Sequence, residues 1–122
     1  MAEIYHMIPE DEWAQAAPGT GYAPESLATE GFIHCTAGEA NLIDVAGRYY
    51  PGSPASWLVL VIDPSRVRAE IRWELQPDGL AYPHIHGPLN TDAVTAVLPF
   101  PRDASGAFLP FRFPPGTQPA RG

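Results

Sequence analysis

Four stretches of the chain show patterns that are typical of β-strands. Residues 2–8 and 68–75 alternate between polar and apolar positions, which predicts strands with one face in the core. Residues 57–62 (WLVLVI) form a continuous apolar run between Pro, Ser and Asp residues, and this predicts a strand that is buried on both faces. Residues 31–35 (GFIHC) predict a shorter strand.

Two helices are predicted between these strands. Pro9 and the acidic residues that follow it are typical of a helix start, so a short helix is expected from Pro9 to about residue 17. Apolar residues recur with helical spacing over residues 37–50, which predicts an amphipathic helix. Thr36 and Glu39 match the capping-box pattern at its start.

The remaining segments are rich in Gly and Pro. Residues 18–26 predict a loop that borders a pocket, with a helical turn at 25–29, and residues 94–98 predict either a last strand or a short helix. A single domain is expected over residues 1–113, followed by a disordered tail at 114–122. The order of elements predicts an α+β fold with a mixed or split, largely antiparallel sheet and two or three helices.

Composition removes several classes of function. The 122 residues include seven arginines, no lysine and fourteen acidic residues, which give a net charge of −7. Broad nucleic-acid binding is not expected without a basic surface, and chemistry that needs a lysine amine is excluded. With a single cysteine and without a long apolar run, the chain is expected to be cytoplasmic, with no disulfide within the chain and no membrane partner.

All four histidines, His6, His34, His84 and His86, lie in or beside predicted strands. Imidazole is a common general acid or base, and it also exchanges hydrogen bonds with ribose hydroxyls and amides. Two interpretations stay open. The histidines either share a polar pocket, or they are separate core and surface residues.

His84 and His86 fall on one face of a strand, and together with His34 they could ligate zinc or iron. The acidic ligand that would complete such a site is missing, because Leu89, Asn90 and Thr91 follow the second histidine. No metal is therefore expected. Cys35 lies next to His34 on a strand, so their side chains point to opposite faces, and Cys35 is expected to pack in the core.

Glu74 ends a strand in which it follows Arg72 and Trp73. A carboxylate at that place is either held ionised by Arg72 or a histidine, protonated through burial, or simply solvated. Trp73 and Tyr82 are either core residues or surfaces on which a planar ligand ring stacks.

The segments IYHM, EGFIHCT, LVLVID, IRWE and YPHIHGPL together resemble the bacterial domain-of-unknown-function family 952 over about residues 3–100. The fold of that family resembles that of the ADP-ribosyltransferases, in which a split sheet surrounds an NAD-binding cleft. The resemblance implies that His6 bonds a ribose hydroxyl and that His34 takes the second-strand position, with Thr36 at the following helix cap. The third position is Glu74 or His84.

The hypothesis is therefore an NAD- or ADP-ribose-processing transferase or glycohydrolase that takes NAD as its substrate. Its candidate residues fall into a catalytic and a ligand-binding set. The catalytic set is His6, His34, Glu74 and His84, and the binding set is Thr36, Arg72, Trp73, Tyr82 and His86. The alternatives are a small-ligand-binding module without turnover and a metal enzyme built on the last two histidines.

Overall fold

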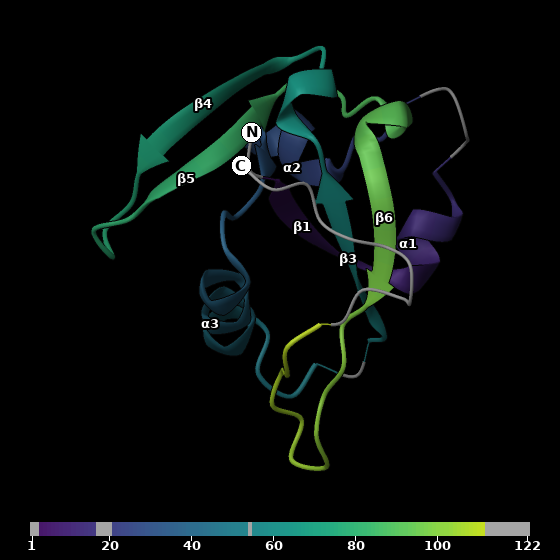
Figure 1. Cartoon of the computed structure of the whole chain (residues 1–122), viewed down its shortest axis with the longest axis vertical. Helices are drawn as coiled ribbons and strands as arrows, with labels where there is room; N and C mark the ends of the chain where they lie inside the picture. The colour runs from purple at the N-terminus through teal and green to yellow at the C-terminus, as the bar shows by residue number, and fades with distance from the viewer. Residues whose placement is uncertain (1–2, 17–20, 54, 112–122) are drawn as a thin grey trace.

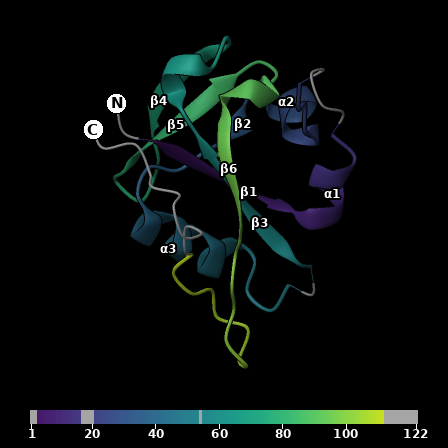
Figure 2. The same ribbon diagram turned by 45° about the vertical axis from the view of Figure 1, so that its right-hand side comes forward.

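The computed structural model describes residues 3–16, 21–53 and 55–111 of the chain. Within these residues the chain forms two three-stranded antiparallel sheets and three α-helices (Figures 1 and 2). The α+β prediction is confirmed. The predicted domain end at residue 113 and the tail at 114–122 lie outside the described residues.

The first sheet has the order β1-β3-β6, with β1 at Ile4–Pro9, β3 at Trp57–Ile62 and β6 at Val94–Pro99. Its central strand, β3, is buried along almost its whole length, because apolar clusters pack against both faces of the sheet. The ambiguous segment at 94–98 is a strand, and a short 3-10 helix (η2, Thr91–Ala93) precedes it.

The second sheet has the order β2-β5-β4, with β2 at Ile33–His34, β5 at Ala81–His86 and β4 at Glu70–Leu75. The hairpin of β4 and β5 projects from the rest of the molecule in Figure 1. Residues opposite each other in an antiparallel pair share a face, so the charged residues of β4 lie on the same face as the histidines of β5.

The first and third helices are shorter than the sequence predicts, whereas the turn expected at 25–29 is a helix one residue longer. The first, α1, spans Glu10–Ala14 with Pro9 at its N-cap, and α2 spans Glu25–Glu30. The amphipathic helix, α3, spans Glu39–Tyr49, and its buried residues are Leu42 and Ala46. These two residues pack in the apolar cluster on the α3 side of the first sheet. A second 3-10 helix, η1 at Pro64–Arg66, follows β3.

The capping-box prediction at Thr36 is wrong. The N-cap of α3 is Gly38, whose φ of 90° lies in a region that favours glycine, and no side chain caps the helix. Thr36 instead exchanges both backbone hydrogen bonds with Tyr5 of β1, each at 2.8 Å. The backbone of Thr36 is therefore committed to a β-bridge, which moves the start of the helix toward the C-terminus.

One short segment, residues 33–36, joins the two sheets. Ile33 pairs with Ile85 of β5, whereas three residues later Thr36 pairs with Tyr5 of β1. Pairing with β5 stops at His34, and the next residue of β5 in the register is Pro83. Because Pro83 has no N–H to donate, it cannot continue the ladder toward Cys35.

The close approach of Gly87 to Ala69 generates a prediction about stability. A Cβ at Gly87 would lie 2.8 Å from the Cβ of Ala69, so Gly87→Ala should lower the free energy of unfolding by about 1–3 kcal/mol through overpacking. Urea denaturation of the variant and the wild type measures the change.

Gly47 provides the control, because it lies within α3 and a Cβ there meets nothing within 4 Å. Gly47→Ala should raise the free energy of unfolding by about 0.5–1 kcal/mol through its effect on helix propensity. Equal effects of the two substitutions would contradict the packing described for Gly87.

Candidate functional site

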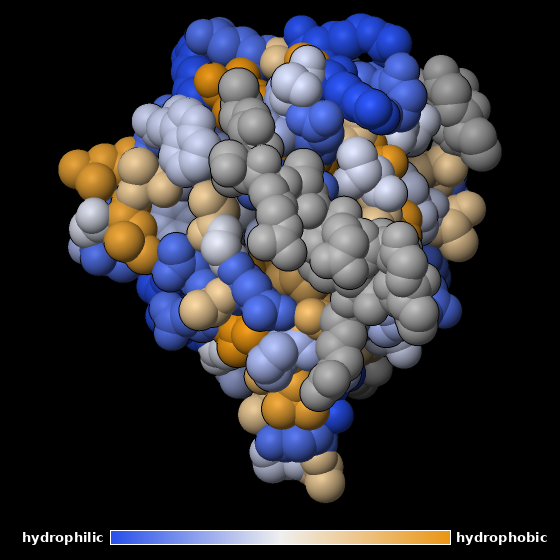
Figure 3. All heavy atoms as spheres, viewed as in Figure 1, coloured by the Kyte–Doolittle hydropathy of each residue, from blue (hydrophilic) through white to orange (hydrophobic). Residues whose placement is uncertain are grey.

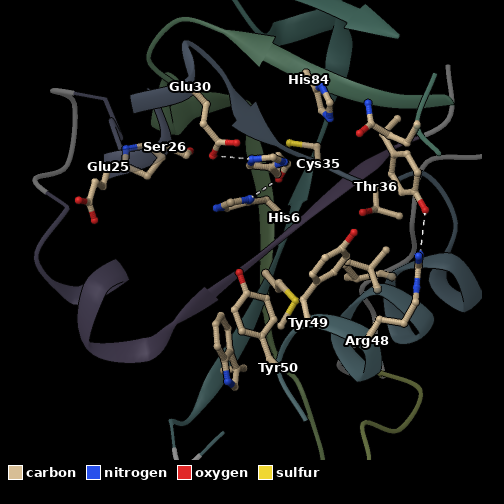
Figure 4. Close-up of a pocket in the computed structure, with 18 of the residues that line it drawn as sticks. His6, Glu25, Ser26, Glu30, Cys35, Thr36, Arg48, Tyr49, Tyr50 and His84 are labelled. Carbon is tan, nitrogen blue, oxygen red and sulfur yellow. Dashed lines mark hydrogen bonds and ion pairs between the residues drawn. The ribbon is translucent and has the colours of Figure 1, made fainter. Parts of the chain in front are cut away.

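A cavity of about 690 Å³ lies beside the segment that joins the two sheets. Residues of β1, β2, β5, α2 and α3 contribute to its wall (Figure 4). Its volume is within the usual range for small-molecule sites, about 300–1,000 Å³. Side chains from both sheets therefore meet at one cavity.

His6 lies in the middle of β1 and points into this cavity (Figure 4). Its Nδ1 is 2.6 Å from the backbone carbonyl oxygen of His34. A carbonyl can only accept, so Nδ1 carries the proton and the neutral ring presents an unprotonated Nε2. Burial lowers the pKa of His6 to about 4, so the ring is neutral near pH 7.

Tyr22 and Glu12 form a second hydrogen-bonded pair beside His6. The Tyr22 hydroxyl lies 3.4 Å from His6 Nε2 and donates to the Glu12 carboxylate at 3.1 Å. The backbone of Tyr22 is fixed by two hydrogen bonds with Leu89, which explains how a residue of a Gly- and Pro-rich loop is held at the cavity. Burial, with the nearby Glu12 carboxylate, raises the pKa of Tyr22 and keeps its hydroxyl protonated.

His34 lines the cavity next to His6 and is more exposed to solvent, with 54% of its side chain accessible. Its Nε2 is 3.0 Å from a carboxylate oxygen of Glu30, the last residue of α2. The ring centroid of His34 is 5.3 Å from that of His84 in an edge-on arrangement. The helix α2 thus supplies an acidic partner for one of two neighbouring imidazoles.

His84 is almost fully buried and is oriented by a carboxylate. Its Nδ1 donates to Oε1 of Glu74 at 2.9 Å, and Nε2 of His86 donates to the same oxygen at the same distance. These two hydrogen bonds lower the pKa of Glu74, so it is ionised and acts only as an acceptor. Phe32 stacks on the His84 ring at 4.2 Å, which fixes the plane of the ring.

The second nitrogen of His84 is accessible from the cavity. Among the described residues Nε2 of His84 has no hydrogen-bond partner. Every fully buried side-chain nitrogen or oxygen in this part of the chain has a partner, so Nε2 is not fully buried. His84 lines the cavity, so Nε2 is reached from there. A histidine bound to a carboxylate through one nitrogen and open through the other has the arrangement of a general base.

A second polar group lies on the far side of the cavity. Arg48 of α3 donates to Asp78 at 3.1 Å and to the Tyr82 hydroxyl at 3.3 Å, and Tyr82 donates to Asp78 at 2.5 Å. Of the arginines in the described ranges, only Arg48 lines the cavity, whereas three glutamates do so. Figure 4 shows Glu25 and Glu30 on the opposite side of the cavity from Arg48. The lining is therefore acidic near the histidines, and at the other end its cation, Arg48, is paired with Asp44 and Asp78 at 3.1 Å each.

The nine site residues predicted from the sequence divide into three groups. Lining the cavity are His6, His34, Thr36, Tyr82 and His84. Glu74 and His86 lie behind His84 and act on the cavity only through it.

Arg72 and Trp73 do not line the cavity. Arg72 pairs with Glu70 at the surface at 2.9 Å. The sequence predicted that the face of this strand opposite Arg72 lies in the core. Trp73 is on that face, but it is 58% exposed, so the prediction is wrong at this residue.

Sequence reasoning missed Glu12, Tyr22, Glu30, Arg48 and Asp78. The loop containing Tyr22 was expected to border a pocket, but nothing in the pattern indicated that its hydroxyl would lie between β1 and α1. The ion pair between Arg48 and Asp78 joins residues thirty positions apart, and no local signal indicates such a pairing.

Two sequence expectations concern metal and thiol chemistry. Within residues 3–16, 21–53 and 55–111, no group of three or more His, Cys, Asp or Glu side chains is placed to hold a metal ion. Cys35 packs in an apolar cluster with 2% of its surface exposed, and burial raises its pKa, which leaves the thiol protonated.

None of the helices in the described part of the chain is long and apolar enough to cross a membrane.

The fold and the cavity define a small α+β protein with a histidine-lined site, and comparison with known proteins assigns its family. Residues 7–97 match the model of DUF952, described as a protein of unknown function, so the chain belongs to the DUF952 family. A search of curated proteins finds no match.

Solved structures of the protein CC0527 from Caulobacter crescentus are similar to the chain. The crystal structure has a TM-score of 0.74 and 27% identity, and the match covers 88% of this chain and 93% of CC0527. The solution NMR structure gives a TM-score of 0.68 at 25% identity, over 87% and 90% of the two chains.

The low pKa of His6 predicts a dependence of stability on pH. Between about pH 4 and 6.5 the unfolded chain binds a proton at His6 that the folded chain does not bind, so stability rises with pH through this window. On going from about pH 7 to pH 4, the free energy of unfolding should fall by up to about 3 kcal/mol more for the wild type than for His6→Gln. Urea denaturation at a series of pH values measures this difference. An NMR titration of His6 with a midpoint near its ordinary pKa would contradict the prediction.

Proposed function

We propose that the chain is an enzyme that processes an NAD- or ADP-ribose-type nucleotide, as a transferase or a glycohydrolase. The observation that carries the proposal is the convergence of His6, His34 and His84 on one cavity, where Glu74 orients the last of them. Imidazoles that differ in partner and exposure around one cavity are more typical of a reaction site than of structural packing.

The distribution of charge around the cavity supports a ligand with separated charges. Carboxylates of Glu12, Glu25 and Glu30 lie among the lining residues at the histidine end, where they favour a cationic or neutral ring. Arg48 lies across the cavity, and an anionic group such as a phosphate would bind it in exchange for one of its two ion pairs, with Asp44 and Asp78. An oxidised nicotinamide nucleotide carries a positive ring, which suits the acidic end of the cavity, and a negative diphosphate, for which Arg48 is the available cation.

The protein groups suit cleavage of the bond between the ribose and the nicotinamide. In that reaction the C1′–N bond breaks with its electron pair on the ring nitrogen, which turns the cationic ring into neutral nicotinamide. A water or acceptor hydroxyl forms the new bond to C1′, and its proton passes to Nε2 of His84. The Glu74 carboxylate stabilises the imidazolium that results, in the way that a carboxylate supports a catalytic histidine in other enzymes.

His6 has a different task in this proposal. Its Nδ1 is occupied by the His34 carbonyl and its ring stays neutral, so Nε2 can accept a hydrogen bond from a ribose hydroxyl. This is the role that the family resemblance implies for His6. Ordering the ribose in the cavity contributes to the rate by positioning the reacting bond.

A binding module without turnover is the second candidate, and one observation favours it. Met7 and Ile8 stand where the NAD-binding transferases of the resemblance have a Gly-Thr pair after the first histidine. Met7 lines the cavity, whereas the side chain of Ile8 is fully buried in the core. Ile8 therefore cannot contact the ligand in the way that this pair does. The two candidates differ in turnover and share the ligand.

Titration calorimetry with NAD, ADP-ribose and nicotinamide, followed by an assay for released nicotinamide, tests the proposal. Heat of binding together with release supports the enzyme, and binding without release supports the module. Absence of binding by all three compounds overturns the nucleotide proposal.

A matched pair of histidine variants tests the role of the Glu74–His84 pair. His84→Gln should lower nicotinamide release by about 10²–10⁴-fold, the range for loss of a general base. His86→Gln removes the other donor to Glu74 without altering the cavity wall, and release should stay within about tenfold of the wild type. Equal losses in the two variants would show that His84 acts only as a structural partner of Glu74.

His34→Ala separates a ligand contact from a fold contact. The side chain is half exposed, so its removal should cost about 1 kcal/mol or less in unfolding free energy while removing the stabilisation that NAD gives the wild type. Thermal melts of both proteins with and without NAD measure the two effects. A large fall in melting temperature with unchanged stabilisation by NAD would contradict this role.

A further inference from the structure

Strand β4 forms an open edge of the second sheet. Its partner on one side is β5, and no described strand pairs with its other side. Backbone groups alternate in direction along an antiparallel strand, and the N–H of Gln76 points to Leu80 on the β5 side of the hairpin. The even-numbered residues of β4 therefore face β5, and the backbone groups of Ile71, Trp73 and Leu75 face outward from the sheet.

This edge carries exposed apolar side chains. Trp73 is 58% exposed and Leu75 is 74% exposed, and Leu80 lies nearby in the turn of the hairpin with 42% exposed. Hydrophobic side chains are visible at the projecting end of the hairpin in Figure 3. Large exposed apolar residues beside unpaired backbone groups are typical of a surface that pairs with another strand.

The β6 edge of the first sheet is protected against pairing with another strand. The N–H of Phe100 donates to Trp57 on the β3 side, so the alternation turns Val97 and Pro99 outward on β6. A proline at an outward position removes a donor and discourages edge pairing. No residue of β4 is a proline, so the β4 edge lacks the protection that the β6 edge has.

We propose that a second copy of this chain pairs with the β4 edge, antiparallel and two-fold symmetric about Trp73. In this register Trp73 faces Trp73 of the second copy and Ile71 faces Leu75. The outward N–H and C=O groups of all three residues then find partners across the axis. Exposed apolar side chains of the two copies cover one another on one face of the joined sheet.

The charged residues of β4 select this register. About Trp73, Arg72 of one copy lies opposite Glu74 of the other, and pairs of opposite charge stabilise adjacent strands. A register centred on Arg72 instead places two arginines opposite each other. A register centred on Ile71 also pairs opposite charges, but there Leu75 faces Val67, which lies before the start of β4 and outside the strand.

The pairing has a consequence for the candidate site. Arg72 of the second copy would lie beside Glu74, the carboxylate that orients His84. Each copy thus supplies a cation to the other, on the side of Glu74 away from the cavity. This makes Arg72 a positioning residue for the site of its partner, although it does not line its own cavity.

Sedimentation of the full chain over about 1 μM to 1 mM tests the interface, because weak to moderate dimers dissociate in this range. The wild type should change from monomer to dimer as the concentration rises. Leu75→Pro should stay monomeric, and Val97→Pro, the same substitution at an outward position of the other edge, should dimerise as the wild type does. Circular dichroism checks that both variants fold. A monomeric wild type throughout, or equal behaviour of the two variants, overturns the proposal.

Cysteine substitution tests the register. Trp73→Cys places two sulfurs on the two-fold axis, where opposed Cα atoms of a hydrogen-bonded pair lie about 5.5 Å apart, a separation that suits a disulfide. Under mild oxidation this variant should form a covalent dimer. The variant Leu75→Cys should not form a covalent dimer, because residue 75 of one copy lies about 13 Å along the strand from residue 75 of the other. Covalent dimers from both variants, or only from Leu75→Cys, overturn the register.

Charge variants test the contact with Glu74 independently. Arg72→Glu places like charges opposite each other and should weaken dimerisation by about tenfold or more for the two symmetric contacts. Glu70→Gln should leave dimerisation unchanged, because Glu70 faces the uncharged Gln76 in this register. If Glu70→Gln weakens the dimer as much as Arg72→Glu does, the register about Trp73 is overturned.

Discussion

The backbone bridge between Tyr5 and Thr36 sets the geometry on which the rest of the structure depends. Through this bridge Thr36 pairs with the first sheet, whereas Ile33 and His34, at the start of the same segment, pair with β5 of the second sheet. The carbonyl of His34 lies within this segment and holds the ring of His6. Both histidines therefore share one rigid frame, and the cavity exists because the two sheets part on either side of it.

The parting of the sheets follows from one residue type at one position. Pro83 removes the donor that would carry the β2–β5 ladder past His34, so the chain at Cys35 turns from one sheet to the other. Cys35 itself is buried in the apolar cluster, while the neighbouring His34 side chain is half exposed. The alternation of a strand thus places an inert thiol in the core and an imidazole at the cavity.

The sequence predicted the elements whose pattern is local. The continuous apolar run of β3 and the alternation in β1 and β4 were sufficient to predict these strands, and the helical spacing in α3 was sufficient to predict that helix. Prediction from the sequence failed where a contact with a residue far along the chain determines the local conformation. Thr36 has the sequence context of a helix cap, but the pairing of its backbone with Tyr5 stabilises the extended conformation there instead.

The site was predictable only in the same partial sense. Histidines at strand positions can be found by reading the chain, and two of them in β5 were expected on one face because strand side chains alternate. The sharing of one oxygen of Glu74 by His84 and His86 depends on the register between β4 and β5, which no local pattern fixes. Tyr22 and Arg48 reach the cavity through contacts with Leu89 and Asp78 that are equally invisible in the sequence.

The environments of His6 and His84 suit these two residues to separate roles in the proposed reaction. His6 has one nitrogen fixed by a backbone carbonyl, which is a neutral partner, and burial holds its pKa near 4. His84 has one nitrogen fixed by the carboxylate of Glu74, whose pKa is lowered by its hydrogen bonds to His86 and His84. In the proposed reaction a proton leaving a bound hydroxyl passes to Nε2 of His84, while His6 remains an uncharged hydrogen-bonding group. The division follows from which strand supplies the partner of each imidazole: β2 offers only its backbone to His6, whereas β4 offers a carboxylate to His84.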